Sequence, residues 1–395
     1  MILIVEPVWT GTHHAPGNSV TIQTIALAWP EQSVRVLAEA THLAELTADP
    51  AFAELRNVTV ESIRVSGHFR FRPHLVSVRR GLRELATLFG AIWTSPRAQP
   101  VLLVLISATP TAIFAAALLT RLFRRSIHVV VGLHGNLNDA MGWRSRNPVL
   151  RAIDLHAALT AEHGGRVRFL VLEPAIRRAL AERMPATAAR TDVLPLPVNQ
   201  AELALCRDAP FKAPLRIGLV GQATEAKGIT AFLDLASSFP PDRVAFDLVG
   251  RIPPNNDPAR YAPLRQPVRA TPLSRSEFQD GLSRLHFVCL PMQLGYYDLS
   301  ASGALLDAIT WLRPIIAFPV PAVRDLFEAF GDIGYLCADV DAMHATIETL
   351  ARDMDEDRYA GQVERLRLIR DGRSPARLAS GLRAAWRAGF PTLFA

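Results

Sequence analysis

The chain has 395 residues, a length typical of two or three domains at roughly 150 residues each. Hydrophobic residues make up 49% of it and charged residues 20%, which excludes a largely disordered or collagen-like protein. The three cysteines form no Cys-x-x-Cys pair, so a zinc ribbon is excluded and a secreted disulfide framework is disfavoured. We therefore expect a folded protein from a reducing compartment.

The first residues, MILIVEPVWTG, contain an apolar run that is too short for a signal peptide and predicts a buried strand. A longer uncharged stretch at 98–120 reaches the length of about 20 residues that a membrane span needs. Polar residues and Pro110 interrupt it, however. A strand at 101–106 and a buried helix at 111–123 explain the stretch better than a span does.

Positive charge is carried almost entirely by arginine, since lysine occurs only at Lys212 and Lys227 and the formal net charge is +6. Residues 56–97 hold eight arginines against two acids, an excess as large as that of the whole chain. Interleaved aromatic residues suit a surface attracted to anionic lipid headgroups, while a solvated helix face explains the same charges. Nucleic acid is disfavoured, because no nucleic-acid-binding motif accompanies the charge. The candidate membrane contacts are Arg64, Arg70, Arg72, Arg79, Arg80 and Arg83.

Short apolar runs alternate with helical segments along the chain, which predicts parallel sheets covered by helices on both faces. The predicted strands are 2–5, 34–37, 101–106, 127–131, 169–172, 216–220, 245–249, 287–290 and 314–318. Prolines and polar residues around 194–215 suit a linker. We expect the α/β class, with two doubly wound, Rossmann-like domains at 1–198 and 213–375 facing a cleft. A helix at 376–395 is expected to pack back on the N-terminal domain.

Two motifs in the second half are suited to an anion. A strand ends at Gly221-Gln222, and Lys227-Gly228 leads into the next helix, where amides and the helix dipole favour negative charge. The spacing matches neither a dinucleotide fingerprint nor a P-loop, and a surface loop is the alternative.

The second motif is Ser300-Ala301-Ser302-Gly303 at the start of a helix, with Asp307 one turn later. Small residues expose the first amides to a diphosphate, and Asp307 is placed to accept hydrogen bonds from ribose hydroxyls. A serine-capped helix with Asp307 in a salt bridge is the structural alternative.

These motifs resemble those of the GT-B glycosyltransferases, especially the family-4 type. Gly221-Gln222-x4-Lys227-Gly228 keeps the spacing of that family's Gly-Arg-x4-Lys-Gly, with Gln in place of Arg. The second signature of the family, Glu-x7-Glu, has Asp307 at its second acid but Leu299 at its first, between Asp298 and Ser300. The resemblance implies that Gly221, Gln222, Lys227, Ser300, Ser302, Gly303 and Asp307 bind a nucleotide-sugar donor.

In the first half, the resemblance assigns His134, just after a strand, to the donor sugar, so Lys227 and His134 are the expected catalytic residues. Gly11, His13 and His14 lie in the loop after the first strand, where the family positions the acceptor. The pairs Asp339/Asp341 and Asp353/Asp355 are spaced like a metal-binding Asp-x-Asp, but both suit helix ends, and Asp341 is expected to cap a helix near residue 342. Ser274 and Glu277 fit a capping box.

The resemblance thus implies transfer of a sugar from a nucleoside diphosphate sugar to a hydroxyl of a glycan or lipid-linked acceptor, without a metal or other cofactor. We expect a cytoplasmic protein, peripheral at the inner face of the plasma membrane. The missing first acid and the Arg-to-Gln change leave a second hypothesis open, a non-catalytic partner protein that binds a nucleotide or glycan. An epimerase of the same fold is a third.

Overall fold

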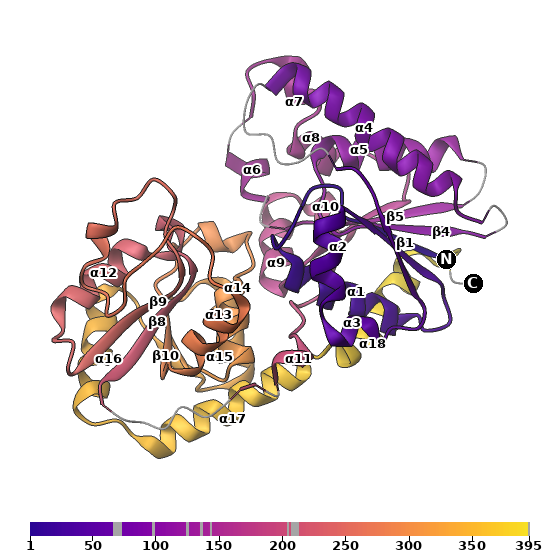
Figure 1. Cartoon of the computed structure of the whole chain (residues 1–395). Coiled ribbons are helices and arrows are strands. Elements are labelled where there is room, and N and C mark those ends of the chain that lie inside the picture. The colour runs from indigo at the N-terminus through magenta and orange to yellow at the C-terminus, as the bar shows by residue number, and fades with distance from the viewer. Residues whose placement is uncertain are drawn as a thin grey trace. The chain divides into compact units, whose positions relative to one another are not determined.

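The structure is a computed structural model that describes residues 1–65, 73–96, 99–123, 126–134, 137–142, 144–203, 205–206 and 213–393, with the backbone alone for 73–77. Arg70 and Arg72 therefore lie outside the described residues. The chain divides into two compact units (Figure 1). The N-terminal unit joins Met1–Asn199 to Arg373–Ala395, and the C-terminal unit is Gln200–Gly372.

The N-terminal unit contains a parallel sheet of order β3-β2-β1-β4-β5-β6-β7. Its strands β1, β4 and β5 are buried along their whole length, as expected for a parallel sheet with helices on both faces. The strands are β1 (Ile2–Val5), β2 (Val34–Ala38), β3 (Val58–Ser62), β4 (Val101–Leu105), β5 (Ile127–Gly132), β6 (Val167–Val171) and β7 (Thr191–Val193).

Helices cover both faces of this sheet. One face packs against α1, α2, α3 and the C-terminal helix α18. On the other face, α4 and α5 pack side by side (Figure 1). The helices are α1 (Ala15–Ala28), α2 (Ala40–Thr47), α3 (Pro50–Ala53), α4 (Pro73–Trp93), α5 (Pro110–Leu122), α6 (Leu137–Gly142), α7 (Pro148–Ala152), α8 (Leu155–Thr160), α9 (Pro174–Arg183), α10 (Pro185–Ala188) and α18 (Pro375–Gly389).

The C-terminal unit contains a second parallel sheet, of order β12-β11-β10-β8-β9. Its strands are β8 (Leu215–Gln222), β9 (Val244–Arg251), β10 (Phe287–Leu290), β11 (Ile315–Ala317) and β12 (Gly334–Leu336). Its helices are α11 (Gln200–Leu203), α12 (Ile229–Ser238), α13 (Arg275–Ser283), α14 (Gly303–Thr310), α15 (Pro321–Phe330), α16 (Val340–Arg352) and α17 (Glu356–Gly372), with 3-10 turns η1 (Glu225–Lys227), η2 (Pro258–Tyr261) and η3 (Tyr296–Asp298).

All nine predicted strands are present, and the structure adds β3, β7 and β12. Strand β3 is an edge strand with a largely exposed surface, and β7 and β12 have three residues each, so none has the continuous apolar run that marks a buried strand. The uncharged stretch at 98–120 forms β4 and most of α5. Among the described residues, no helix combines the length and the apolar character needed to cross a bilayer.

Helix caps confirm one prediction and correct another. Ser274 and Glu277 form the predicted capping box at the start of α13. The cap of α16, in contrast, is Asp339, whose carboxylate accepts a hydrogen bond from the Ala342 amide at 2.8 Å. The prediction of Asp341 was wrong because the helix begins earlier, at Val340, and places Asp341 in its first turn.

The C-terminal helix α18 contributes its apolar face to the core of the N-terminal unit. Trp386 is fully buried and stacks on Trp29, directly after α1, with ring centroids 5.2 Å apart. Just before the helix, Arg373 donates two hydrogen bonds to Glu173, at 2.8 and 3.0 Å, and both side chains are buried. The end of the chain is therefore part of the fold of the first unit.

We expect Trp386→Ala to lower the free energy of unfolding of the N-terminal unit by about 3–5 kcal/mol, because it leaves a cavity beside Trp29. Trp93→Ala is the matched control, since Trp93 is 54% exposed on α4 and its loss should cost about 1 kcal/mol or less. Urea unfolding of both variants measures this. Equal losses would show that α18 adds little to the core.

Candidate functional site

The order of the second sheet defines where a ligand can bind. From β8 the chain moves outward to β9 and then crosses to β10 on the other side, so β8 and β10 are neighbours at a topological switch point. In doubly wound sheets ligands bind beyond the carboxyl ends of the strands at such a point. The loops after β8 and β10 begin here, and they carry both predicted donor motifs.

Close backbone packing joins these two loops. Gly228 has φ +78°, and a Cβ added to it would lie 1.9 Å from the Pro291 carbonyl oxygen, so only glycine fits. The Gln293 amide donates a hydrogen bond to the Ala226 carbonyl at 3.0 Å. Lys227 is therefore held against the start of the loop that follows β10.

Lys227 lies over the end of β8. Its Nζ donates a hydrogen bond to the Val220 carbonyl at 2.8 Å, and a Cβ on Gly221 would lie 2.4 Å from that nitrogen. Burial lowers the pKa of Lys227, and the negative charge of Asp307 offsets part of that effect. The structure thus brings Gly221, Lys227 and Asp307 together.

Helix α14 begins at this same edge of the sheet. The Ser302 hydroxyl caps it by accepting the Leu305 amide at 3.2 Å. The amides of Gly303 and Ala304 find no acceptor in the described part of the chain, which is normal for a first helical turn. Ser300 is buried, and Leu299 is 1% exposed, so the position of the missing first acid belongs to the core.

Asp307 is partly buried one turn into α14. Burial raises its pKa from 3.8 to about 6, although the positive charges of Arg275 and Lys227 act in the opposite direction. Arg275, the first residue of α13, also forms an ion pair with the buried Glu202, which accepts a hydrogen bond from Trp311 Nε1 at 3.4 Å. Sequence reasoning missed Arg275 and Glu202, because no local motif marks either of them.

A second arginine was also missed. Gln222, the last residue of β8, is paired in register with Arg251, the last residue of β9. Paired residues of adjacent strands place their side chains on the same face, with strands about 4.8 Å apart. Arg251 has no ion-pair partner among the residues that the structure describes. A guanidinium is therefore available beside Gln222.

In the N-terminal unit, the sheet order reverses between β1 and β4, and the loop after β1 is held there by buried polar groups. Glu6 is 1% exposed and accepts hydrogen bonds from the Val8 and Trp9 amides at 2.8 and 3.0 Å. Its other oxygen accepts one from Asn18 of α1 at 3.1 Å. Burial raises the pKa of Glu6 in spite of these hydrogen bonds.

His42 of α2 holds the far end of this loop. Its Nδ1 lies 2.8 Å from the Gly11 carbonyl, which can only accept, so Nδ1 carries the proton. Nε2 is then the acceptor for the Asn18 amide at 3.1 Å. The Gly11 amide donates to Thr41 Oγ1 at 2.9 Å. Glu6 directly after a buried strand was a sequence signal for this network, whereas Asn18 and His42 gave none.

The predicted histidines His13 and His14, at the end of this loop, lie near His134. The rings of His13 and His14 lie 5.8 and 4.6 Å from that of Trp9, and the rings of His14 and His134 are 6.0 Å apart. Burial, followed by the nearby charge of His14, lowers the pKa of His134 to about 3. His134 is therefore a neutral imidazole at physiological pH.

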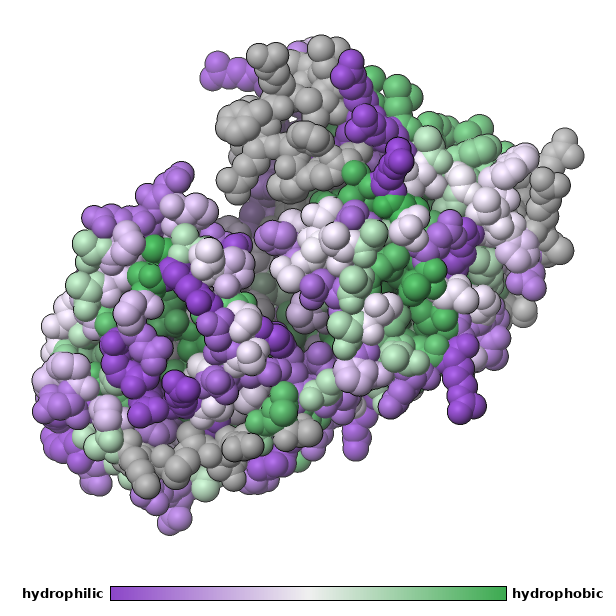
Figure 2. All heavy atoms as spheres, viewed as in Figure 1, coloured by the Kyte–Doolittle hydropathy of each residue, from purple (hydrophilic) through white to green (hydrophobic). Residues whose placement is uncertain are grey.

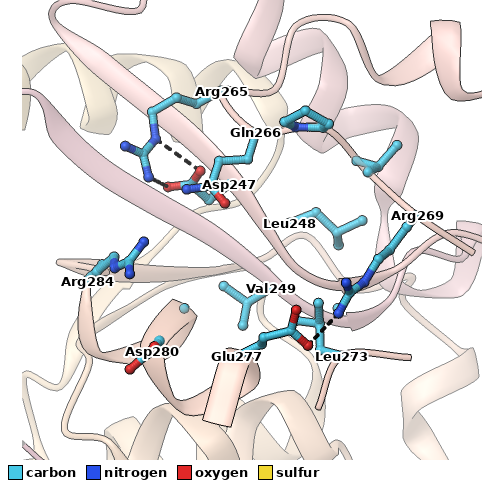
Figure 3. A pocket seen from close by; sticks show the side chains of 14 residues that line it. Asp247, Leu248, Val249, Arg265, Gln266, Arg269, Leu273, Glu277, Asp280 and Arg284 are labelled. Carbon is cyan, nitrogen blue, oxygen red and sulfur yellow. Dashed lines mark hydrogen bonds and ion pairs between the residues drawn. The ribbon is translucent and has the colours of Figure 1, made fainter. Parts of the chain in front are cut away.

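A separate pocket of about 260 Å³ lies along the outer edge of β9, next to α13 (Figure 3). Arg265 donates to Asp247 at 3.1 and 3.2 Å, and Arg269 donates to Glu277 at 2.5 Å. Arg284 and Asp280 complete a balanced set of three arginines and three acids. None of the predicted donor residues lines this pocket, and its matched charges do not favour a diphosphate.

Asp307 makes stability depend on pH. Because its pKa is raised in the folded state, the folded protein keeps this proton to higher pH than the unfolded chain does. We expect the free energy of unfolding to fall by up to about 3 kcal/mol as pH rises from about 4 to 6, and Asp307→Asn to remove this fall. Urea unfolding over this pH range measures it, with Asp280→Asn as the exposed control. Parallel curves for wild type and Asp307→Asn would contradict the prediction.

No family model matches the sequence, and no curated protein matches it. Solved structures do. A glycosyltransferase from Rickettsia africae superposes with a TM-score of 0.64 at 11% identity, covering 99% of this chain and 98% of that one. Anabaena HepE, solved with UDP, has a TM-score of 0.63 at 15% identity, covering 98% and 99%. The UDP-GlcNAc 2-epimerase of Neisseria meningitidis has a TM-score of 0.51 at 14% identity, covering 98% and 100%. The chain therefore has the GT-B glycosyltransferase fold.

Proposed function

We propose that the protein transfers a sugar from a nucleoside diphosphate sugar to a hydroxyl acceptor. The observation that carries the proposal is the arrangement at the switch point of the second sheet. There, the packing of Gly228 on Pro291 brings Lys227 to the loop that leads into α14. An ammonium group and the free first amides of a helix form a seat suited to a diphosphate.

In the proposed reaction, the acceptor oxygen forms a bond to C1 of the sugar while the bond from C1 to the diphosphate oxygen breaks. The acceptor proton passes to solvent or to a base, and negative charge develops on the departing diphosphate. Lys227 and the amides of Gly303 and Ala304 would stabilise this charge as it forms. We propose that they do so without a metal ion, and turnover that is unchanged by a chelator is the corresponding expectation.

Asp307 is assigned to the ribose hydroxyls, as an acid placed one turn into a helix can accept their hydrogen bonds. Gln222 would donate a hydrogen bond to the phosphates, and Ser300 and Ser302 would shape the loop around them. Arg251 is proposed to supply the guanidinium that Gln222 lacks, since the register places the two residues side by side.

The residues at the switch point of the N-terminal unit are assigned to the acceptor and to the transferred sugar. Gly11, His13 and His14 are proposed to contact the acceptor. A base with a pKa of about 3 accepts protons poorly at neutral pH, so we assign His134 to hydrogen bonding with a sugar hydroxyl and not to proton removal.

The finer proposals concern substrate and setting. We propose a hexosyl donor and an acceptor that is a lipid-linked or exopolysaccharide intermediate, used at the cytoplasmic face of the plasma membrane. A lipid-linked acceptor is supported by the arginine-rich segment at 56–97. The family-4 type within the GT-B fold remains a prediction from the spacing of Lys227-Gly228 and Asp307.

Two observations favour the alternative of a non-catalytic binding protein. Lys227 Nζ is hydrogen-bonded to Val220, and Leu299 fills the position of the first acid with a core side chain. A protein that only binds the donor needs neither a mobile ammonium group nor that acid.

The first experiment is a thermal-shift panel of UDP-, GDP- and ADP-sugars, because a ligand that binds only the native state raises Tm. UDP-glucose comes first, since HepE has been solved with it. A donor hydrolysis assay follows with each donor that binds. Hydrolysis supports the transferase, and binding without turnover across donors and acceptors supports the binding protein.

We expect Lys227→Ala to lower turnover by on the order of a hundredfold, comparable to the loss of one oxyanion donor. Arg243→Ala is the control, because it removes an exposed positive charge just before the first residue of β9, at the end of the strand away from the proposed site. Steady-state kinetics of the purified variants measure the effect. An unchanged rate in Lys227→Ala would remove this residue from the site.

Arg251→Gln should weaken donor binding about tenfold or more, as a charge-assisted hydrogen bond to phosphate is lost. Arg243→Gln should leave the dissociation constant unchanged. Isothermal titration with the nucleoside diphosphate alone separates phosphate contacts from sugar contacts. Equal affinities for wild type and Arg251→Gln would refute the assigned role.

A further inference from the structure

The solvent-facing side of α4 carries an unusual set of side chains. Leu82 is 63% exposed and Trp93 is 54% exposed, although apolar residues of this size are normally turned inward on a surface helix. The exposed positions repeat every three or four residues and so form one stripe. They are Val78, Arg79, Leu82, Arg83, Ala86, Phe89 and Trp93.

Helix α5 extends this stripe sideways. Its exposed residues near the C-terminal end are Leu118, Arg121 and Leu122, of which Leu122 is 62% exposed. The Phe89 ring lies 5.4 Å from that of Phe123, directly after α5, and 5.6 Å from that of Trp93. The two helices therefore present one continuous surface, called here the α4–α5 face. In Figure 2, hydrophobic residues lie next to strongly hydrophilic ones over the part of the molecule where Figure 1 places α4.

The charge on the α4–α5 face has one sign. The single acid of α4, Glu84, points inward and is 4% exposed, where Thr109 donates to it at 2.7 Å and Thr111 at 2.5 Å. Of the arginines that the sequence suggested, Arg79 and Arg83 lie on this face, whereas Arg80 is partly buried beside Glu84. Arg64 is exposed just after β3.

We propose that the α4–α5 face binds the surface of an anionic membrane. Arginines that are interleaved with exposed Trp, Phe and Leu match a bilayer interface, where headgroups pair with the charges and the apolar side chains enter the acyl boundary. A second copy of the chain is a poorer occupant, because it would place like charges opposite each other. This inference does not depend on the proposed transferase activity.

The test is flotation of the full-length protein with vesicles of phosphatidylcholine alone, or of equal parts phosphatidylcholine and phosphatidylglycerol. We expect binding to the anionic vesicles only, with a loss on added salt because the charges are exposed. Arg79→Glu/Arg83→Glu should weaken binding at least about twentyfold, because the loss of each arginine is expected to weaken it about fivefold and the two factors multiply. Phe89→Ser/Trp93→Ser should weaken it about tenfold or more at low salt.

The control is Arg377→Glu/Arg387→Glu, which makes the same change in net charge on α18, the helix that packs on α1. It should bind like wild type. Thermal unfolding checks that each variant folds. If the charge-reversal variant Arg79→Glu/Arg83→Glu does not fold, the neutral variant Arg79→Gln/Arg83→Gln takes its place. Equal binding to neutral vesicles, equal losses in the α18 control, or a wild-type dimer that the Phe89/Trp93 variant dissociates would each overturn the proposal.

Discussion

The site in the C-terminal unit depends on one close contact, that of Gly228 with the carbonyl of Pro291. At 1.9 Å from that oxygen there is no space for a Cβ, and the positive φ excludes most side chains independently. Because of this contact, the loop after β8 and the loop after β10 act as one piece. Lys227 consequently lies where α14 begins. Two motifs that are far apart in the sequence are thereby brought together in the fold.

Electrostatics distinguishes this place from the rest of the unit. The pocket beside β9 contains as many acids as arginines, and two of the arginines are paired with acids, Arg265 with Asp247 and Arg269 with Glu277 (Figure 3). At the switch point, burial raises the pKa of Asp307 while the positive charges of Arg275 and Lys227 act in the opposite direction, and Arg251 lies beside Gln222 on the neighbouring strand. Positive charge next to free helix amides is what a diphosphate requires, and the charges of Arg275 and Lys227 also favour the ionised form of Asp307.

Both units use the same physical scheme. In each, a parallel sheet reverses its strand order, and the loops at the reversal are held by glycines and buried hydrogen bonds. The N-terminal loop is fixed by Glu6, Asn18 and His42, which leaves His13 and His14 exposed beside Trp9. The outward-facing α4–α5 face belongs to the same unit, so the chemistry proposed for acceptor binding and the proposed membrane contact lie on one folded body.

Local pattern was enough for much of this protein. Apolar runs predicted the long buried strands, and Lys227-Gly228 with the small residues before Asp307 marked the carboxyl ends of β8 and β10, because these features act over a few residues. Local pattern did not predict the roles of Arg251, Arg275 and Glu202, because strand register and helix packing bring these residues to the site from distant parts of the chain. The same reason applies to α4: the sequence by itself determined that its segment is rich in arginine and apolar residues, but only the tertiary structure decided which of them face water, because burial depends on what packs against the helix.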